Sequence, residues 1–478
     1  MDEFNQEQLI KKDWVPLNKR EHLSYIHVVA ISIGNLAPHL LFVIIPVLFT
    51  PLAQSFYISS LAQTFILLYG SFAGFACAPL VGVYSDSCMF KWGRRRLFIV
   101  TGSIFMSLGL LLLTYTESVG EWFSGNKNPL KAQQALFVIS YMLTVTAGNI
   151  ANAPTRTICS DVCPPSQQSL MANLCSVFSA LGGILVNLIG GLKIYKYVGS
   201  LGQEQFELIV SITLIVISIT ITVFAAHEEP LKDKVPKVRP FKRIFNAIKT
   251  APTPFWRTAI PYLLAQMSLF QFNFYFSHFM GQDIFGGDNG NNAPSEEKQK
   301  YQDGLSWAMM CNIVRFGTQF LYGFLNTKIC ELIGMRATSV IAYFVLATGF
   351  ITFFWVKNKY AYIAIVILVG SGYAVAMSVP YAIVSIVAPN EEKGAYLGLL
   401  MMCTVIGEIL SNFGVGRLFG LIWPNNPRKM IAISSTIGYL ASILSFWTIE
   451  PKVEKEEYQS VTNSQSEVIP LVSENSKL

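Results

Sequence analysis

The sequence has few charged residues, since Asp, Glu, Lys and Arg together make up 13% of its 478 residues. Soluble domains carry about 25% charged residues, so a soluble globular protein does not fit this composition. Apolar residues in contrast make up 52% of the chain. We therefore expect most of the polypeptide to lie inside a lipid bilayer.

The sequence also lacks the residue patterns of common catalytic and metal-binding sites. Its eight cysteines include no CxxC pair, and no nucleophile–base or metal-ligand cluster is visible. This predicts that the chain is not an enzyme and holds no metal or other cofactor. The net charge of +6 is spread over several connecting segments, so we expect no nucleic-acid partner.

Long apolar stretches recur along the whole chain. A membrane-spanning helix needs about 20 mostly apolar residues. Twelve stretches meet this requirement: 24–50, 59–84, 97–115, 134–158, 169–193, 207–226, 255–280, 304–325, 336–356, 359–385, 394–420 and 430–449. The sequence thus predicts an all-α polytopic membrane protein with twelve transmembrane helices.

Basic residues lie before the first span, between spans two and three, and most densely between spans six and seven. Lys and Arg next to spans mark the cytoplasmic side, so both termini are expected in the cytoplasm. The predicted domains are a cytoplasmic segment, an N-terminal six-helix bundle, a cytoplasmic linker, a C-terminal six-helix bundle and a disordered cytoplasmic tail: 1–23, 24–226, 227–254, 255–449 and 450–478.

The two halves share a pattern near the ends of their fourth spans. Pro154 is followed ten residues later by Pro164, and Pro380 is followed nine residues later by Pro389. Each pattern precedes a polar run and a helix rich in small residues. This similarity indicates two six-helix pseudo-repeats, with a binding site between them at the middle of the membrane.

Four motifs in this order carry a resemblance to a known family: Gly82–Cys88 with Trp92–Arg96, Asn149–Asp161, Met280–Gly287, and Ser378–Ala382 with Gly394–Gly398. The chain resembles the major facilitator superfamily and, within it, the sucrose/proton symporter branch (glycoside-pentoside-hexuronide:cation symporter-like). The resemblance implies the major facilitator fold and a secondary transporter. Such a carrier would move a sugar, either a disaccharide such as sucrose or a hexose, by alternating access.

Two departures from that branch concern proton coupling. An acidic residue that the branch usually carries eleven positions before Arg156 is replaced here by Val145. An acidic pair before Met280 is replaced by Phe276 and His278. Sugar transport remains the expected function, whereas proton coupling by the usual residues is not expected.

The fourth span carries the first group of candidate substrate-binding residues. Asn149, Asn152 and Arg156 share one helical face with Val145, at spacings of four, seven and eleven residues. A guanidinium beside two amides can bind sugar hydroxyls. In the alternative interpretation, Arg156 is a structural residue that extends toward the cytoplasm.

Further candidates lie in spans one and seven. Asn35 and His39 are one turn apart, and Pro38 and Pro46 are expected to interrupt their helix. Polar groups beside a helix break can line a cavity, although a structural histidine is an equal alternative. Phe274 is a candidate for stacking on a sugar ring; packing or contact with lipid is the alternative.

Arg315 and Glu408 are the candidates for coupling transport to protons. Both are expected near mid-depth in spans eight and eleven, where ionisable residues are costly and often functional. Glu408 can act as a protonatable group because burial favours its neutral form. Alternatively, the two residues form a static ion pair that holds the helices together.

A third group is expected to form a cytoplasmic gate: Asp86, Gly93, Arg94, Arg95, Arg96 and Asp161. Asp161 ends span four and can meet the basic segment after span two when the gate is closed. Such pairs would break and re-form as the halves move. The alternative is that the arginines act only in setting the topology.

The expected partners are a small-molecule sugar, the lipid bilayer and, in the coupled case, protons; the chain is expected to be a monomer. Two other functions stay open, a solute-sensing receptor that does not transport and a carrier of a non-sugar organic solute. The expected location is either the plasma membrane or an endolysosomal or vacuolar membrane.

Overall fold

A computed structural model describes residues 15–125, 129–191, 203–228, 240–288, 294–389, 392–415, 422 and 426–449. Over these ranges the regular structure is helical and contains no strand. The predicted tail 450–478 and the first fourteen residues of the predicted segment 1–23 lie outside the described residues, as do residues 229–239 of the predicted linker.

Helices of the first half follow the predicted spans. They are η1 (Leu17–Lys19), α2 (Tyr25–Ser32), η2 (Ile33–Asn35), α3 (Leu36–Ser55), α4 (Ser60–Asp86), α5 (Arg96–Thr114), α6 (Thr116–Ser124), α7 (Pro129–Val162), η3 (Pro165–Gln167), α8 (Gln168–Gly191) and α9 (Gln203–Ala225). Ser59 caps α4, with its hydroxyl accepting from the Ala62 amide at 3.4 Å.

Helices of the second half also follow the predicted spans, and α10 lies in the predicted linker. They are α10 (Pro240–Thr250), α11 (Thr253–Phe279), the π-helix η5 (Met280–Ile284), α12 (Ser295–Ile333), α13 (Met335–Thr352), α14 (Ala361–Val387), α15 (Lys393–Ile409), the π-helix η6 (Leu410–Val415) and α17 (Pro427–Ser445). Each of the twelve predicted spans therefore contains a helix, and the all-α membrane fold is confirmed.

The break in the first span lies earlier than predicted. The chain changes to 3-10 geometry at Ile33–Asn35, and α3 then runs without interruption through Pro38 and Pro46. Pro38 is the third residue of α3, where a missing amide hydrogen costs little. The prolines therefore do not interrupt the helix, and Asn35 rather than His39 lies at the break.

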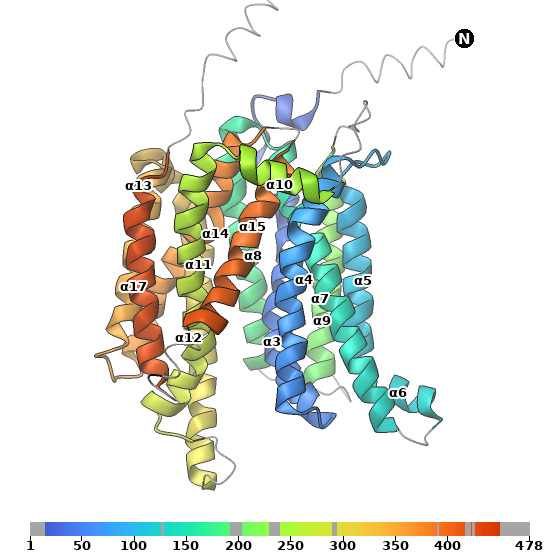
Figure 1. The fold of residues 1–478 in the computed structure, drawn as a ribbon, viewed down its shortest axis with the longest axis vertical. Helices are drawn as coiled ribbons and strands as arrows, with labels where there is room; N and C mark the ends of the chain where they lie inside the picture. The colour runs from blue at the N-terminus through green and yellow to red at the C-terminus, as the bar shows by residue number, and fades with distance from the viewer. Residues whose placement is uncertain are drawn as a thin grey trace, which may run out of the picture.

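Eight helical stretches in the described part of the chain are long and apolar enough to cross a membrane. Three of them are Arg96–Thr114, Gln205–Ala225 and Ala361–Val387. The long helices run side by side along the long axis of the molecule (Figure 1). Such an arrangement satisfies backbone hydrogen bonds inside each helix, as a bilayer requires.

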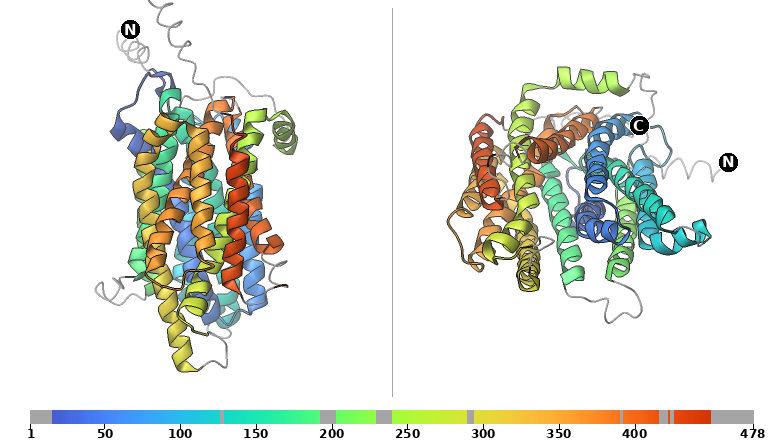
Figure 2. Two further views of the ribbon diagram at one scale, coloured as in Figure 1. Left: turned by 90° about the vertical axis from the view of Figure 1, so that its left-hand side faces the viewer. Right: turned by 60° about the horizontal axis from the view of Figure 1, so that its bottom comes forward.

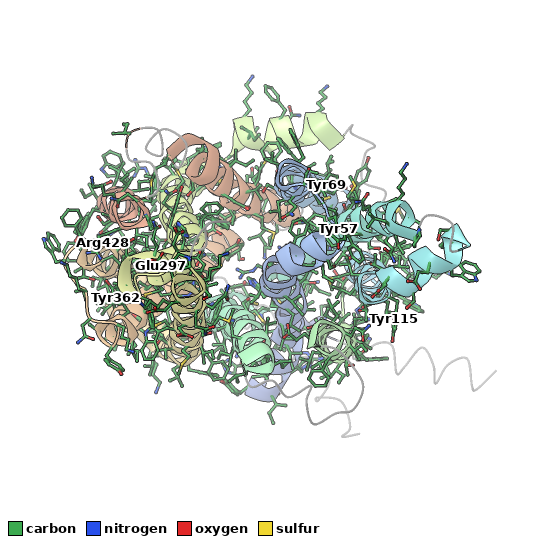
Figure 3. All side chains as sticks on the ribbon, turned by 90° about the horizontal axis from the view of Figure 1, so that it is seen from below. Tyr57, Tyr69, Tyr115, Glu297, Tyr362 and Arg428 are labelled. Atoms are coloured by element: carbon green, nitrogen blue, oxygen red, sulfur yellow. The ribbon has the colours of Figure 1, made fainter. Side chains whose placement is uncertain are left out.

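Each half has its own apolar core. One core gathers residues of α2, α3, α5, α7, α8 and α9, including Leu40, Met106 and Phe137. Another gathers residues of α11–α14 and α17, including Phe272 and Phe350. Seen from below, Tyr57, Tyr69 and Tyr115 lie on one side of the molecule, and Glu297, Tyr362 and Arg428 lie on the other (Figure 3).

A third core joins the two halves. It contains Ala78, Val83 and Ala153 of the first half together with Tyr381 and Leu397 of the second. The same cluster includes Ala247 of α10. This helix lies across the upper end of the bundle, roughly at right angles to the long helices (Figures 1 and 2). We call this end of the molecule the α10 end.

The helix α10 is an amphipathic surface helix within the predicted linker. Ala247 is buried against the bundle, whereas Lys242, Phe245 and Lys249 are exposed. A helix with basic and aromatic residues on its outer face suits the boundary between lipid headgroups and water.

Small residues allow the helices of the first half to approach closely. A Cβ added at Gly102 of α5 would lie 2.9 Å from the Ala151 amide nitrogen and 3.0 Å from the Ala147 carbonyl oxygen of α7. Backbone atoms cannot move aside as a flexible side chain can. The α5–α7 contact therefore requires glycine at position 102.

We predict that Gly102→Val destabilises the protein by about 1–3 kcal/mol, because the added atoms overlap the α7 backbone. The measurement is thermal unfolding in detergent. Gly317→Val is the matched control, since an added Cβ there meets no atom within 4 Å. Equal melting temperatures for the two variants would contradict the close approach.

Candidate functional site

Arg95 is the centre of an ion-pair network at the α10 end. Its side chain is fully buried and donates to Asp86 at the end of α4. The Arg95 Nε also donates to Asp161 Oδ2 at 3.1 Å, and Arg94 Nη2 donates to the same oxygen at 2.7 Å. The predicted meeting of Asp161 with the basic segment is present in the structure.

Glu228 joins this network and was not a candidate in the sequence. Its Oε2 accepts from the Arg95 amide at 2.9 Å, and its Oε1 lies 3.8 Å from Arg94 Nε. Gly93, with φ of +120°, lets the turn pass over this carboxylate. Burial, and then repulsion by Asp161, raise the pKa of Glu228 above its usual value.

Arg96 has a different role from its two neighbours. It begins α5, and its Nε donates to the Ala226 carbonyl at 2.8 Å. Because Ala226 follows the last residue of α9, this bond satisfies a free carbonyl at a helix end. Arg96 thus ties α5 to α9 within the first half.

The second half packs directly against the buried Arg95. A Cβ added at Gly394 of α15 would lie 2.6 Å from Arg95 Nη1. A Cβ added at Gly82 of α4 would lie 2.6 Å from the Gly394 carbonyl oxygen. The network therefore positions a surface on which α15 closes. We call this contact, together with Asp86, Asp161 and Glu228, the gate.

Arg156 connects the halves further from the α10 end. It is buried, its Nη1 donates to the Met377 carbonyl at 2.8 Å, and its Cζ lies 3.9 Å from the centre of the Tyr381 ring. The Tyr381 hydroxyl lies 3.0 Å from that of Tyr262, which in turn lies 2.7 Å from Thr404 Oγ1. Arg156 is therefore held at the interface between the halves.

A small cavity of about 20 Å³ lies beside Arg156. It is lined by Arg156, Cys159, Ser160, Gln168, Met171, Ala172, Cys175, Tyr381, Ser385 and Leu397. A space of this size holds about one water molecule. The cavity is too small for a sugar.

The other residues expected near Arg156 have varied surroundings. Asn149 Nδ2 donates to the Val145 carbonyl of its own helix at 2.9 Å, and Asn152 is half-buried. His39 lies on α3 and is half-buried. These three residues stay candidates for substrate binding.

Asn35 lies inside the first half. Its Nδ2 donates to the Ser32 carbonyl at 3.0 Å and to the sulfur atoms of Cys159 and Cys175 at 3.4 and 3.2 Å. These contacts fix the amide between α7 and α8. Asn35 is therefore well placed to position the helices around Arg156 and remains only a predicted ligand.

Arg315 and Glu408 do not form the ion pair that was one of the two alternatives. Arg315 Nε donates to Asn312 Oδ1 at 3.2 Å on its own helix. Glu408 instead accepts from Ser71 Oγ of α4 at 3.3 Å. The Arg315 and Glu408 side chains bind different partners, although the sequence predicts a similar depth in the membrane for both residues. Glu408 thereby contacts the opposite half.

Phe274 is separate from the Arg156 surroundings. Its side chain is 63% exposed and packs edge-on against Tyr275, with ring centres 5.0 Å apart. Within the described ranges, no ring contact joins it to the interface residues above. Its stacking on a sugar stays a prediction.

A row of amides on α12 was missed at the sequence level. Asn326 Nδ2 donates to Asn173 Oδ1 of α8 at 2.7 Å, and Gln319 Nε2 donates to the Ser176 carbonyl at 3.2 Å. The signal was present, because Asn312, Gln319 and Asn326 recur every seven residues on one helical face.

These features define an α-helical membrane carrier whose two halves meet through buried polar groups and close at one end. The Major Facilitator Superfamily model matches residues 31–412, and the chain belongs to this superfamily of transporters.

Similar proteins agree with this assignment. The chain is 26% identical over 446 residues to the sucrose transport protein SUC4 of Arabidopsis thaliana, covering 83% of this chain and 85% of that protein. It is 24% identical to the sucrose transport protein SUT1 of Oryza sativa subsp. japonica, over 87% and 86% of the two chains. The fold matches a bacterial homologue of the iron transporter ferroportin in an outward-facing state, with a TM-score of 0.64, 10% identity, and 88% and 99% coverage.

We predict that Gly394→Val opens the gate, because the larger side chain overlaps the Arg95 guanidinium. Spin labels at Tyr84 and Arg336, on opposite halves at the α10 end, should report longer distances than in the unsubstituted protein. Gly317→Val serves as the matched control. An unchanged distance distribution in Gly394→Val would show that this contact does not hold the gate closed.

Proposed function

We propose that this protein transports a sugar across a membrane by alternating access. The observation that carries the proposal is Arg156, a buried guanidinium whose contacts span the two halves. The similarity to sucrose transport proteins over more than four-fifths of the chain supports a sugar as substrate. A disaccharide such as sucrose or a hexose fits this proposal.

Polar groups at the interface supply what sugar binding needs. Sugar hydroxyls must exchange their water for donors and acceptors on the protein. Arg156 offers several N–H donors, and Asn149, Asn152 and His39 offer donors and acceptors nearby. Release of the Met377 carbonyl by Arg156 would free one donor when the halves separate.

We propose that the chain moves as two bundles joined by a linker. Residues 24–226 and 255–449 act as two bundles that rock against each other, and 227–254 connects them. We propose that the α10 end faces the cytoplasm, because exposed basic residues such as Lys242 and Lys249 gather there. Both termini would then be cytoplasmic, in the plasma membrane or an endolysosomal or vacuolar membrane.

In this proposal the gate works by exchanging contacts between two states. With the gate closed, Gly394 covers the Arg95 network, and Lys393 Nζ lies 3.5 Å from the Ser160 carbonyl. Opening exposes the network to water, which solvates its charges. A substrate favours one state by as much as it binds that state more tightly.

Glu408 is the proposed coupling residue, should transport be driven by protons. It is half-buried next to the last residue of α15, and its contact with Ser71 crosses between the halves. A carboxylate in that position must be neutralised or solvated before the halves separate. Protonation of the Glu408 carboxylate would neutralise its charge before the halves separate.

Uptake by purified protein in proteoliposomes tests the proposed function. We expect saturable uptake of sucrose or glucose, and a loss of at least about tenfold in Arg156→Gln because a buried donor fork is removed. Arg257→Gln, at an exposed arginine of α11, is the matched control. Lack of carbohydrate uptake by correctly folded protein would refute sugar transport.

We predict that Glu408→Gln abolishes accumulation of substrate against its gradient but preserves equilibrium exchange. The amide keeps the size and hydrogen bonding of the acid and cannot carry the proton. The measurement compares uptake driven by an imposed proton gradient with exchange in its absence. Accumulation and pH dependence equal to the unsubstituted protein would remove Glu408 from the coupling role.

A further inference from the structure

The helix α10 lies over the place where the two halves meet at the gate. It packs against α4 of the first half and α15 of the second. Its buried residue Ala247 belongs to the same apolar cluster as Val83 of α4 and Leu399 of α15. Only residues 251 and 252 separate the end of α10 from the start of α11. The helix is thus attached to the second half and rests on both halves.

The opposite face of α10 is turned away from the bundle. Lys242, Phe245 and Lys249 are exposed, and they follow one another at three and four residues on one helical face. Figure 3, which looks along the long helices, shows α10 at the rim of the bundle with side chains extending sideways from it. In a membrane, lipid occupies the space on that side of the protein. The outer face of α10 therefore meets lipid.

Neighbouring tryptophans place α10 at the level of the lipid headgroups. Trp256 in the first turn of α11 is exposed, and so is Trp447, which follows α17. The Thr448 hydroxyl donates to the Arg257 carbonyl at 3.1 Å, so the two tryptophans lie at a similar height. Tryptophans of membrane proteins gather at the boundary between headgroups and acyl chains. Because α10 ends three residues before α11 begins, it lies at this boundary.

This stretch of the chain carries an excess of positive charge. Between residues 232 and 249 the sequence has seven Lys or Arg residues and one Asp. Phe245 lies between Lys242 and Lys249 on the outer face and is 65% exposed. Such a face suits a membrane surface, where the ammonium groups reach lipid phosphates and the ring enters the acyl chains. The charge requires a lipid whose headgroup is negative overall.

We propose that α10 binds anionic phospholipids of the adjoining leaflet, and that the bound lipid favours the closed gate. The orientation of the outer face toward lipid depends on the support that Ala247 finds on α4 and α15. Opening the gate separates these two helices and removes part of that support. A lipid that binds the supported helix more tightly shifts the equilibrium toward the closed state. The inference concerns the gate and does not depend on which solute is transported.

A zwitterionic lipid fits the outer face of α10 less well. Its phosphate can accept a hydrogen bond from a lysine, but the choline group bonded to that phosphate repels the ammonium. An anionic lipid such as phosphatidylglycerol has no such cation. The attraction of several basic residues to a negatively charged membrane surface also adds up.

Nanodiscs of two lipid compositions test this inference. One contains phosphatidylcholine alone, and the other contains about 30% phosphatidylglycerol in addition. Spin labels at Tyr84 and Arg336 report the distance across the α10 end, in the unsubstituted protein and in Gly394→Val. We expect phosphatidylglycerol to reduce the fraction of molecules with the longer, open-gate distance by about threefold. An open fraction that is equal or larger in the anionic discs, for both proteins, would overturn the proposal.

Substitution of the two lysines makes the test specific. Lys242→Gln combined with Lys249→Gln should remove most of the difference between the two lipid compositions. Lys131→Gln combined with Lys357→Gln is the matched control, because both lysines are exposed and lie at the opposite end of the bundle. The control should retain the difference. A lipid effect that survives the loss of Lys242 and Lys249, or that the control also removes, overturns the assignment to α10.

A soluble phosphate distinguishes a lipid site from a phosphate site. Glycerol 3-phosphate, added to the phosphatidylcholine discs, offers the headgroup phosphate without acyl chains. We expect it to leave the open fraction unchanged, because Phe245 and the membrane surface contribute only when lipid is bound. A response equal to that of phosphatidylglycerol would overturn lipid as the ligand. None of these measurements requires sugar uptake, so their failure leaves the proposed function unaffected.

Discussion

Burial of a guanidinium is costly unless carboxylates surround it. The surroundings of Arg95 show how the protein offsets this cost. Arg95 is fully enclosed and is served by Asp86 and Asp161, while Glu228 holds its backbone amide. These acids come from the ends of α4, α7 and α9, so one cation gathers several helix ends. Gly394 of α15 packs against the Arg95 guanidinium. The close approach of the two halves at this end depends on that contact.

The gate and the middle of the interface differ in how their charges are balanced. At the gate, cations and carboxylates come from the same half, so the network can persist when α15 moves away. In the middle, Arg156 and Arg315 rely on a carbonyl, an amide and aromatic rings. Charges that are balanced within one half can thus remain paired by themselves, whereas the two central arginines have no ion-pair partner among the described residues.

Sequence patterns located the gate better than the centre. The sequence predicted that Asp161 can meet the basic segment after span two, because both lie at the ends of spans on the same side of the membrane. The sequence did not predict the role of Glu228. This residue follows span six, and it contacts the turn after span two only because α5 and α9 pack together. The expected break at Pro38 was misplaced, because Pro38 lies in the first turn of α3, where proline does not interrupt a helix.

The sequence alone determined the twelve helices and the superfamily resemblance, because apolar length and short motifs are local properties. Tertiary structure alone decided that Glu408 contacts Ser71, that Arg315 lies among Phe272, Phe316 and Tyr373, and that Arg156 lies over Tyr381. Depth along a helix can be counted from residue numbers. The direction of a side chain toward one neighbouring helix rather than another depends on how every helix is rotated and packed.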